Sequence, residues 1–590
     1  MQQMIQKLIN EKLAIPVMDG EDKRCTPQEA IQRYVQKNMT LHFAGVVGAL
    51  AYELTRQFWE KNPAFTIAIT GFGGNLIAMV KKGFTKKIMA SFVGIGYPSP
   101  SPCKIIQNAY AAGDLEIECW TMRTIPQRLL AGALGWDFMP TNSLIGSSME
   151  IDNHESFQTM EAPFSKNGRI GLLKALRPDI TIAHGAMADP AGNTIMTYPL
   201  GGDAYGAWGA KKGVIVSVEK IVSTEYIRQH AHLVRIPADS VLAVCETPFG
   251  AHPGPVTPHG LPDLDSYFSD YDFMIDLAEA TNDPGEWDKW VQKWVLDIKD
   301  HDDYLARLGT EHLLYLKGKS SPDAWISETM TEAATVDFDK EPNSVERLVL
   351  SAADVIADVC VKRGYKSMLA GIGLSNLGAW LATHNLKAAG HKMNLLAEIG
   401  MVGYQPRFSD PSVFSMHNNY SCTMLSNIET ALGYNVGGAT NQCLGVLGAG
   451  QIDVHGNANS TKITDTFYLL GSGGANDIAT TNQETLVVMK SGKTRLVDKV
   501  HYVTYPGTKV KTLVTDVGVF EKVDNQDTFT LTAYLPAKDS DTEAECLAHI
   551  QERVGWELQV ASNLKRIELI VEKDDLNMLR LYDPRGFFIG

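Results

Sequence analysis

The 590-residue sequence has no apolar run long enough to cross a membrane. A spanning helix needs roughly 20 consecutive apolar residues, and no uninterrupted stretch approaches that length. The first ten residues alternate polar and apolar side chains and lack the apolar centre of a signal peptide. The sequence therefore predicts a cytoplasmic protein with no membrane partner.

Paired cysteines and positive charge are also scarce. The 8 cysteines form no Cys-x-x-Cys pair and no cluster with histidine at zinc spacing, so we expect reduced, structural cysteines and no metal. Lys and Arg number 53 against 68 Asp and Glu, and the formal net charge is −15. This acidity argues against a nucleic-acid partner. Lys211 and Lys212 are the basic pair considered for a phosphorylated ligand, with a solvated pair as the simpler interpretation.

The sequence does contain repeated units of strand, glycine turn and helix. Residues 40–44 are apolar and β-rich, the turn contains Gly45 and Gly48, and an amphipathic helix follows at 49–59. The unit recurs with a strand at 65–70, a turn that ends in Gly73 and Gly74, and a helix start after it. Such alternation is typical of an α/β fold with parallel strands and crossover helices.

The same order returns in the second half of the chain. Residues 367–370 predict a strand, 371–373 a glycine turn and 377–389 a helix, so the two halves look like weak internal repeats. The tryptophan-rich stretch 285–308 predicts one docked helix. The expected units are an N-terminal extension 1–24, a first α/β domain 25–317, a linker 318–342 and a second α/β domain 343–590.

A carboxylate in an apolar strand is the most unusual feature. Glu398 follows Asn394-Leu-Leu-Ala397 and precedes Ile399 and Gly400, where an ionised side chain is costly unless it is paired or used. The sequence contains no evident set of Ser/His/Asp or Cys/His residues. The glycine spacing at 371–378 does not match a dinucleotide fingerprint, which argues against a Rossmann cofactor.

Two later glycine segments suggest what Glu398 does. One contains Gly456 and Asn457, and the other is Gly471-Ser-Gly473-Gly474-Ala-Asn-Asp477. Backbone amides exposed by successive glycines can converge on a developing oxyanion, and an asparagine side chain can add a donor. The simpler interpretation of both segments is a pair of tight turns.

These residues together resemble the class I coenzyme A transferases. The family's catalytic Glu lies in a Ser-Glu-Asn/Ser-Gly context, which Ala397-Glu398-Ile399-Gly400 resembles with both polar neighbours replaced. Further matches cover most of the chain: Ala188-Asp-Pro-Ala-Gly-Asn193, Gln451-Ile-Asp453 with Gly456-Asn457, the 471–477 segment, and Thr515-Asp-Val-Gly-Val-Phe520. The loop 248–253 and the segment 300–309 resemble the α subunit of the glutaconate CoA-transferase branch.

The resemblance implies two similar open, largely parallel α/β domains of the CoA-transferase (NagB/RpiA-like) fold, with α-type and β-type halves fused in one chain. Glu398 would then attack an acyl-CoA and carry CoA as a glutamyl thioester on its way to a carboxylic acid. Its pKa is expected to be ordinary, about 4.3. The resemblance further implies oxyanion or CoA binding by Gly471, Gly473, Gly474, Asn457 and Gly400. Gly45, Gly48, Gly73 and Gly74 would line the substrate cleft.

Several points stay open. Acyl-CoA and a carboxylic acid are the expected substrates, no tightly bound cofactor is expected, and a homodimer or homotetramer is the expected assembly. The replaced neighbours Ala397 and Ile399 leave an acyl-CoA hydrolase, decarboxylase or ring-opening C–C hydrolase as alternatives, and a ligand sensor on a related fold as a third class. A second substrate carboxylate has no assigned partner, with Arg407, His252 and His259 considered.

Overall fold

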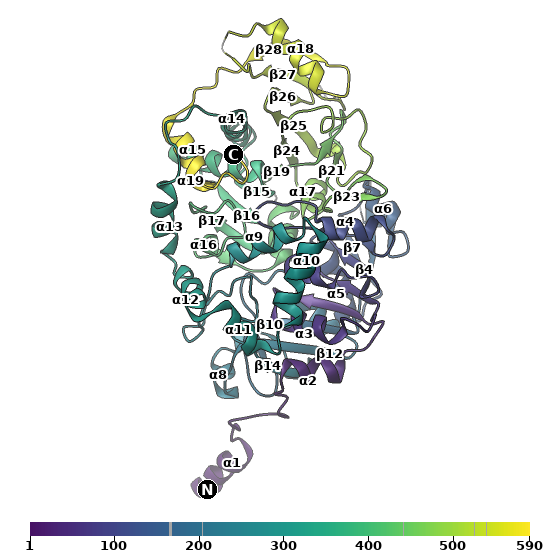
Figure 1. Ribbon diagram of the computed structural model, residues 1–590, viewed down its shortest axis with the longest axis vertical. Coiled ribbons are helices and arrows are strands. Elements are labelled where there is room, and N and C mark those ends of the chain that lie inside the picture. The colour runs from purple at the N-terminus through teal and green to yellow at the C-terminus, as the bar shows by residue number, and fades with distance from the viewer. Residues whose placement is uncertain (165–167, 203, 440–441, 524–525, 539) are drawn as a thin grey trace.

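Two large β-sheets with flanking helices form the body of the protein (Figure 1). The computed structural model describes residues 1–590 apart from 165–167, 203, 440–441, 524–525 and 539. The first sheet and its helices lie in the lower part of Figure 1, and the second sheet lies in the upper part. Among the helices of the described residues, none combines the length and apolar character that a membrane span requires.

The first sheet has nine strands, and most neighbours are parallel. Its order is β13-β11-β10-β1-β2-β4-β6, and β12 pairs with both β10 and β14. The strands are β1 (Thr40–Ala44), β2 (Phe65–Ala68), β4 (Thr85–Ala90), β6 (Glu116–Cys119), β10 (Ile180–Ala188), β11 (Thr194–Ile195), β12 (Gly213–Ile221), β13 (Val234–Ile236) and β14 (Val241–Glu246). The predicted strands at 40–44 and 65–70 are confirmed as β1 and β2.

The second sheet has ten strands in the order β18-β17-β16-β15-β19-β24-β25-β26-β27-β28. Its centre, from β16 to β25, is parallel, and antiparallel hairpins extend it on both sides. The strands are β15 (Ser367–Ala370), β16 (Asn394–Ala397), β17 (Met401–Tyr404), β18 (Met424–Leu425), β19 (Cys443–Leu447), β24 (Glu484–Val488), β25 (Val510–Thr515), β26 (Gly518–Glu521), β27 (Thr530–Tyr534) and β28 (Val560–Arg566). The expected α/β fold with two similar sheets is confirmed.

Helices cover the sheets and begin where the sequence provides caps. Thr26 with Glu29, and Asn343 with Glu346, form capping boxes at the starts of α2 and α14. The helices are α1 (Gln2–Lys12), α2 (Pro27–Tyr34), α3 (Ala49–Phe58), α4 (Lys104–Ala111), α5 (Thr124–Ala133), α6 (Ser148–Asp152), α7 (Ala204–Gly209), α8 (Thr224–Gln229), α9 (Tyr271–Ala280), α10 (Pro284–Val291), α11 (His301–Leu308), α12 (Thr310–Lys319), α13 (Ala324–Ala333), α14 (Ser344–Arg363), α15 (Leu374–Ala388), α16 (Met416–Asn419), α17 (Ala475–Thr481), α18 (Glu543–Arg553) and α19 (Lys573–Tyr582).

Short strands complete the structure outside the two large sheets. β3 pairs with β5, β9 lies between β7 and β8, β20 pairs with β21, and β22 pairs with β23. These strands are β3 (Gly71–Phe72), β5 (Phe92–Val93), β7 (Phe138–Thr141), β8 (Phe157–Glu161), β9 (Arg169–Lys174), β20 (Gln451–Ile452), β21 (Ala458–Asn459), β22 (Lys462–Thr464) and β23 (Phe467–Tyr468).

Two elements between the sheets differ from expectation. The stretch 285–308 is not one helix: α10 continues into a π-helical turn, Gln292–Leu296, and α11 restarts after the cap residue Asp300. Its tryptophans are nevertheless buried in the first core, as the pattern predicted. The range 318–342, expected as a linker, contains helix α13.

The two halves repeat one polar turn in detail, which supports the internal repeat. Asp189 accepts hydrogen bonds from the backbone and side chain of Asn193, with distances of 2.8 and 2.9 Å. Asp453 accepts the same pair of bonds from Asn457, at 2.9 and 3.1 Å. In both turns the glycine before the asparagine donates its N–H to the carbonyl of the aspartate.

Candidate active site

Glu398 lies in the tight turn between β16 and β17, as the sequence predicted. Gly400 closes this turn with a φ of +114°, and a Cβ atom at this position would lie 2.4 Å from the carbonyl oxygen of Ser426. Only glycine fits both constraints. The Gly400 amide donates to the carbonyl of Ala397 at 3.1 Å, so it shapes the turn and is not free to bind an oxyanion, contrary to expectation.

The Glu398 carboxylate lies against Gly474, the residue that precedes α17. A Cβ atom at Gly474 would be 1.9 Å from Oε2 of Glu398, so the carboxylate fills the space that a side chain would need. Burial and the nearby Asp477 carboxylate raise the pKa of Glu398 to about 7, and the Gly474 backbone amide opposes this rise. The ordinary pKa expected from the sequence is therefore wrong, because the turn is enclosed by the second glycine segment.

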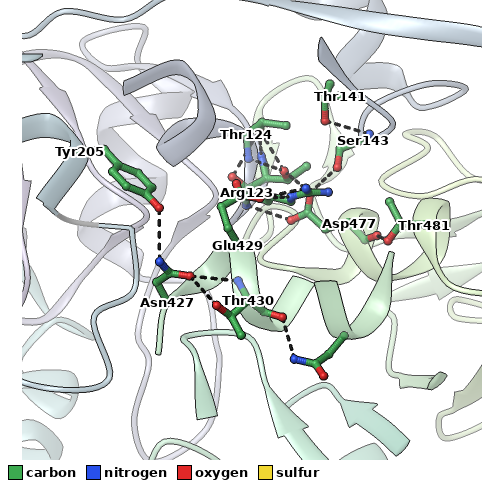
Figure 2. A network of polar contacts seen from close by, with 12 residues as sticks. Arg123, Thr124, Thr141, Ser143, Tyr205, Asn427, Glu429, Thr430, Asp477 and Thr481 are labelled. Carbon is green, nitrogen blue, oxygen red and sulfur yellow. Dashed lines mark hydrogen bonds and ion pairs between the residues drawn. The ribbon is translucent and has the colours of Figure 1, made fainter. Parts of the chain in front are cut away.

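Asp477 links the two halves beside Glu398 (Figure 2). It accepts hydrogen bonds from the hydroxyls of Thr121 and Ser143, both at 2.6 Å, and from the Arg123 backbone amide at 3.0 Å. All three donors belong to the first half of the chain. Burial raises the pKa of Asp477 to about 6 despite these bonds. The sequence contained Asp477 in a family segment but gave no sign of its distant partners.

A second cross-half contact lies beside this network. The Arg123 guanidinium pairs with Glu429 at 2.9 Å, and Figure 2 shows the two side chains next to Asp477. Both side chains are mostly buried, and one carboxylate oxygen of Glu429 has no hydrogen-bond partner among the described residues. The seam next to Glu398 is therefore polar and closely packed.

The glycines at 471 and 473 have a different role from the one expected. The Gly471 amide donates to the carbonyl of Ser460 at 3.0 Å, and the Gly473 amide donates to the carbonyl of Ser91 at 2.9 Å. Their N–H groups are thus already used, and the Gly473 bond joins the second half to the segment after β4. Of the three glycines, Gly474 is the one that faces Glu398.

Asn457 is also committed to the fold. Its side-chain amide donates to Asp453 at 3.1 Å, and its side-chain oxygen accepts from the Gly507 amide at 2.9 Å. The predicted role of Asn457 as an oxyanion donor is therefore wrong in this arrangement, because the hydrogen-bonding groups of the side chain hold the turn described above.

The first-half glycines divide into two groups. Gly73 packs against Gly94, where a Cβ atom would lie 2.3 Å from the carbonyl oxygen. Because β3 pairs with β5, and β5 forms a bridge from Phe92 to Gly471, the turn with Gly73 and Gly74 lies near the seam. The turn with Gly45 and Gly48 is tied to a loop of its own half, since the Gly48 amide donates to Gly250 at 2.8 Å.

A cavity of about 380 Å³ opens where both halves meet the Glu398 turn. Gly201 lines it and donates its N–H to the carbonyl of Ile399 at 3.1 Å, while Ser426 lines it and donates to the carbonyl of Gly400 at 2.8 Å. Tyr205 and Asn427 face each other at its wall (Figure 2). The sequence reasoning missed this wall, because its only local signal is the pair of glycines at 201–202.

The residues considered for substrate charges have partners within the protein. Lys211 pairs with Asp179 at 3.0 Å, which favours the solvated pair over a phosphate site. His252 is buried and bonded to Asp270 at 2.9 Å. The Arg407 guanidinium lies 5.0 Å from the centre of the Trp325 ring.

Known proteins agree with this architecture. The sequence model of a family described as Coenzyme A transferase matches residues 24–246. One of the two subunits of glutaconate CoA-transferase from Acidaminococcus fermentans is 30% identical over 232 residues, which span 35% of this chain and 67% of that protein. The chain belongs to the coenzyme A transferase family.

This CoA-transferase chain is also similar to the other subunit of the same enzyme. That protein is 27% identical over 246 residues, which span 37% of this chain and 86% of its own length. The fold of an acyl-CoA transferase from E. coli O157:H7, solved as a thioester complex with CoA, matches 96% of this chain and 97% of that one, with a TM-score of 0.63 and 16% identity. One chain thus resembles both kinds of subunit.

Proposed function

We propose that this CoA-transferase moves CoA from an acyl-CoA thioester to a carboxylic acid through a glutamyl thioester on Glu398. The observation that carries the proposal is the position of the Glu398 carboxylate, which is partly buried, faces Gly474 and lies beside a cavity between the two halves. A carboxylate held in this way is shielded from water and oriented by the backbone, which are the two conditions a weak nucleophile needs.

The reaction proceeds in balanced steps. A Glu398 oxygen adds to the thioester carbonyl, and the carbon–sulfur bond breaks to leave an acyl-glutamyl anhydride and CoA thiolate. The thiolate then adds to the carbonyl of Glu398, which releases the donor acid and leaves glutamyl-CoA. The acceptor acid reverses both steps and departs as its own CoA thioester, and Glu398 is regenerated.

Negative charge develops on the glutamyl carbonyl oxygen in the second step. The Gly474 amide faces that oxygen and influences the charge of the carboxylate. We assign oxyanion stabilisation to this amide, since preorganised backbone donors supply such stabilisation without reorientation. The amides of Gly471 and Gly473 are excluded because their hydrogen bonds are already made.

A hydrolase on the same scaffold is the second candidate. A carboxyl group with a pKa of about 7 suits a general base that activates water at neutral pH, so the raised pKa of Glu398 favours this alternative as well. The two functions differ in one requirement: transfer needs an acceptor acid, and hydrolysis does not.

A matrix of acyl-CoA donors and carboxylic acid acceptors, read by mass spectrometry, tests the proposal. Glutaconate and 3-oxoadipate belong in the matrix because similar proteins carry those substrates in their names. Formation of acceptor-CoA that requires the added acid supports transfer. Free acid and CoA formed at the same rate without an acceptor would replace it with hydrolysis. The predicted cytoplasmic location and homodimer or homotetramer remain separate proposals, which cell fractionation and light scattering check.

A further inference from the structure

Three side chains from three separate elements meet at one point of the first half, away from Glu398 in the sequence. His252 lies in the loop after β14, Asp270 caps α9, and His312 lies in α12. Nε2 of His252 is 2.9 Å from Oδ2 of Asp270, and Nε2 of His312 contacts the same oxygen. The three ligand atoms lie within 4.8 Å of one another.

The surroundings of this cluster orient each group. Nδ1 of His252 lies 2.7 Å from the hydroxyl of Tyr304, and the second oxygen of Asp270 accepts from the Phe273 amide at 3.0 Å. Such outer hydrogen bonds fix the ring and carboxylate of metal ligands in known sites. His252 and Asp270 are buried, whereas the His312 side chain is 33% exposed and leaves a path from solvent.

Hydrogen bonding alone leaves one polar group unsatisfied. If Nε2 of His252 donates to Asp270, its Nδ1 must accept the proton of Tyr304, because a neutral imidazole has one N–H. The neighbouring Tyr52 ring lies 5.5 Å from Tyr304, and among the described residues the buried Tyr52 hydroxyl has no hydrogen-bond partner. An unpaired buried hydroxyl is a feature that calls for an explanation.

A metal ion at the cluster reverses this chain of bonds. With Nε2 of His252 bound to the ion, Nδ1 carries the proton and donates it to the Tyr304 oxygen. The hydroxyl of Tyr304 is then free to turn toward Tyr52. Ligands about 2.0–2.1 Å from a tetrahedral ion lie about 3.3 Å apart, so binding requires the donors to separate slightly, and the partly exposed His312 is the group able to move.

We propose that His252, Asp270 and His312 form a Zn²⁺ site with one open position for water. Two imidazoles and one carboxylate are a donor set that zinc takes in proteins. This proposal departs from the sequence expectation of no metal, since positions 252, 270 and 312 have no zinc spacing. It does not depend on the role of Glu398.

The ion would brace the loop that supports the first glycine turn. A Cβ atom at Gly48 would lie 2.2 Å from the His252 carbonyl oxygen, and the Gly250 carbonyl accepts from the amides of Gly48 and Ala49. Fixing His252 to α9 and α12 therefore also fixes the start of α3. The expected role is structural, with stability as its readout.

Calorimetric titration of the EDTA-treated full chain with Zn²⁺ tests the site. We expect one ion per chain, intense visible absorption of tetrahedral geometry when Co²⁺ is used, and a melting temperature raised by about 5 °C at a hundredfold excess over Kd. His312→Ala should weaken Zn²⁺ binding by more than about 100-fold, and Tyr304→Phe by about tenfold, because loss of an outer hydrogen bond has that effect at known sites.

His230→Ala is the matched control, because His230 is also partly buried but bonds to the backbone of Tyr226. It should bind Zn²⁺ as the unmodified chain does. If His312→Ala does not fold, His312→Gln provides the same test with a polar side chain. Absence of binding in the unmodified chain, or equal binding by the His312 variants, would overturn the proposal.

Discussion

Oε2 of Glu398 occupies the position that a side chain at Gly474 would take, with 1.9 Å between that oxygen and an ideal Cβ. The backbone of Gly474 has φ −86° and ψ 0°, which any residue adopts. Space for the carboxylate, and not backbone freedom, is therefore the reason for glycine here. This relationship joins the two segments that the sequence singled out separately.

The first prediction is that Gly474→Ala removes activity but not folding. The methyl group displaces the Glu398 carboxylate, and a shift of about 1 Å at a reacting group lowers rates by about 100-fold. The melting temperature should change little because the backbone tolerates alanine. Steady-state transfer rates and thermal unfolding of the same preparation check both parts.

Gly473→Ala is the comparison variant. Its added Cβ meets no atom within 4 Å, although its φ of +51° makes alanine cost roughly 1–2 kcal/mol of stability. We expect lower stability and far smaller loss of activity than for Gly474→Ala. The opposite ranking of the two variants would argue against contact with Glu398 as the cause.

The second prediction concerns pH. Because the pKa of Glu398 is raised to about 7, the nucleophilic carboxylate forms as pH rises, and kcat/KM should increase through about pH 7 to a plateau. Asp477, with a pKa of about 6, titrates with it as a coupled pair. Asp477→Asn removes a neighbouring negative charge and should move this limb to lower pH. A profile flat from about pH 5 to 9 would show that Glu398 does not limit the reaction.

The third prediction is a pH-dependent gain of stability in Glu398→Gln. The carboxyl binds its proton more tightly in the folded chain, so its contribution to stability is complete below its ordinary pKa of 4.5 and is lost as pH rises through about 7. The amide has no charge to bury. The melting temperature of the variant should exceed that of the unmodified chain at about pH 8, with the difference disappearing near pH 4.5.

The fourth prediction separates a structural asparagine from a catalytic one. Asn457→Ala removes the bonds to Asp453 and Gly507 and should cost about 1–3 kcal/mol in the free energy of unfolding, measured in urea. Its kcat should remain close to that of the unmodified chain. A large fall in kcat without loss of stability would restore the oxyanion role predicted from the sequence.

The sequence predicted the parts of this structure that depend on local pattern. The strand at 40–44, the capped helix after Thr26 and the turn at Glu398 follow from periodicity, caps and glycine, which act over a few residues. The same reasoning joined 285–308 into one helix, because amphipathic periodicity continues through the π-helical turn and hides the break before Asp300.

The site needed contacts that local pattern does not encode. Asp477 is bonded to Thr121 and Ser143, which lie 356 and 334 positions away in the chain, and their meeting is a property of how the two sheets dock. The same contacts enclose Glu398 and raise its pKa, so the ordinary value assumed from composition was wrong. Glycine spacing identified the 471–474 segment but did not distinguish Gly474 from its neighbours.

The most direct measurement is the mass of the protein after incubation with acyl-CoA and reduction by borohydride. A glutamyl thioester is reduced to an alcohol, so peptide mass spectrometry should find a modified Glu398 that depends on acyl-CoA and is absent in Glu398→Gln. An unmodified Glu398 in a preparation that transfers CoA, or full transfer activity in Glu398→Gln, would contradict the account.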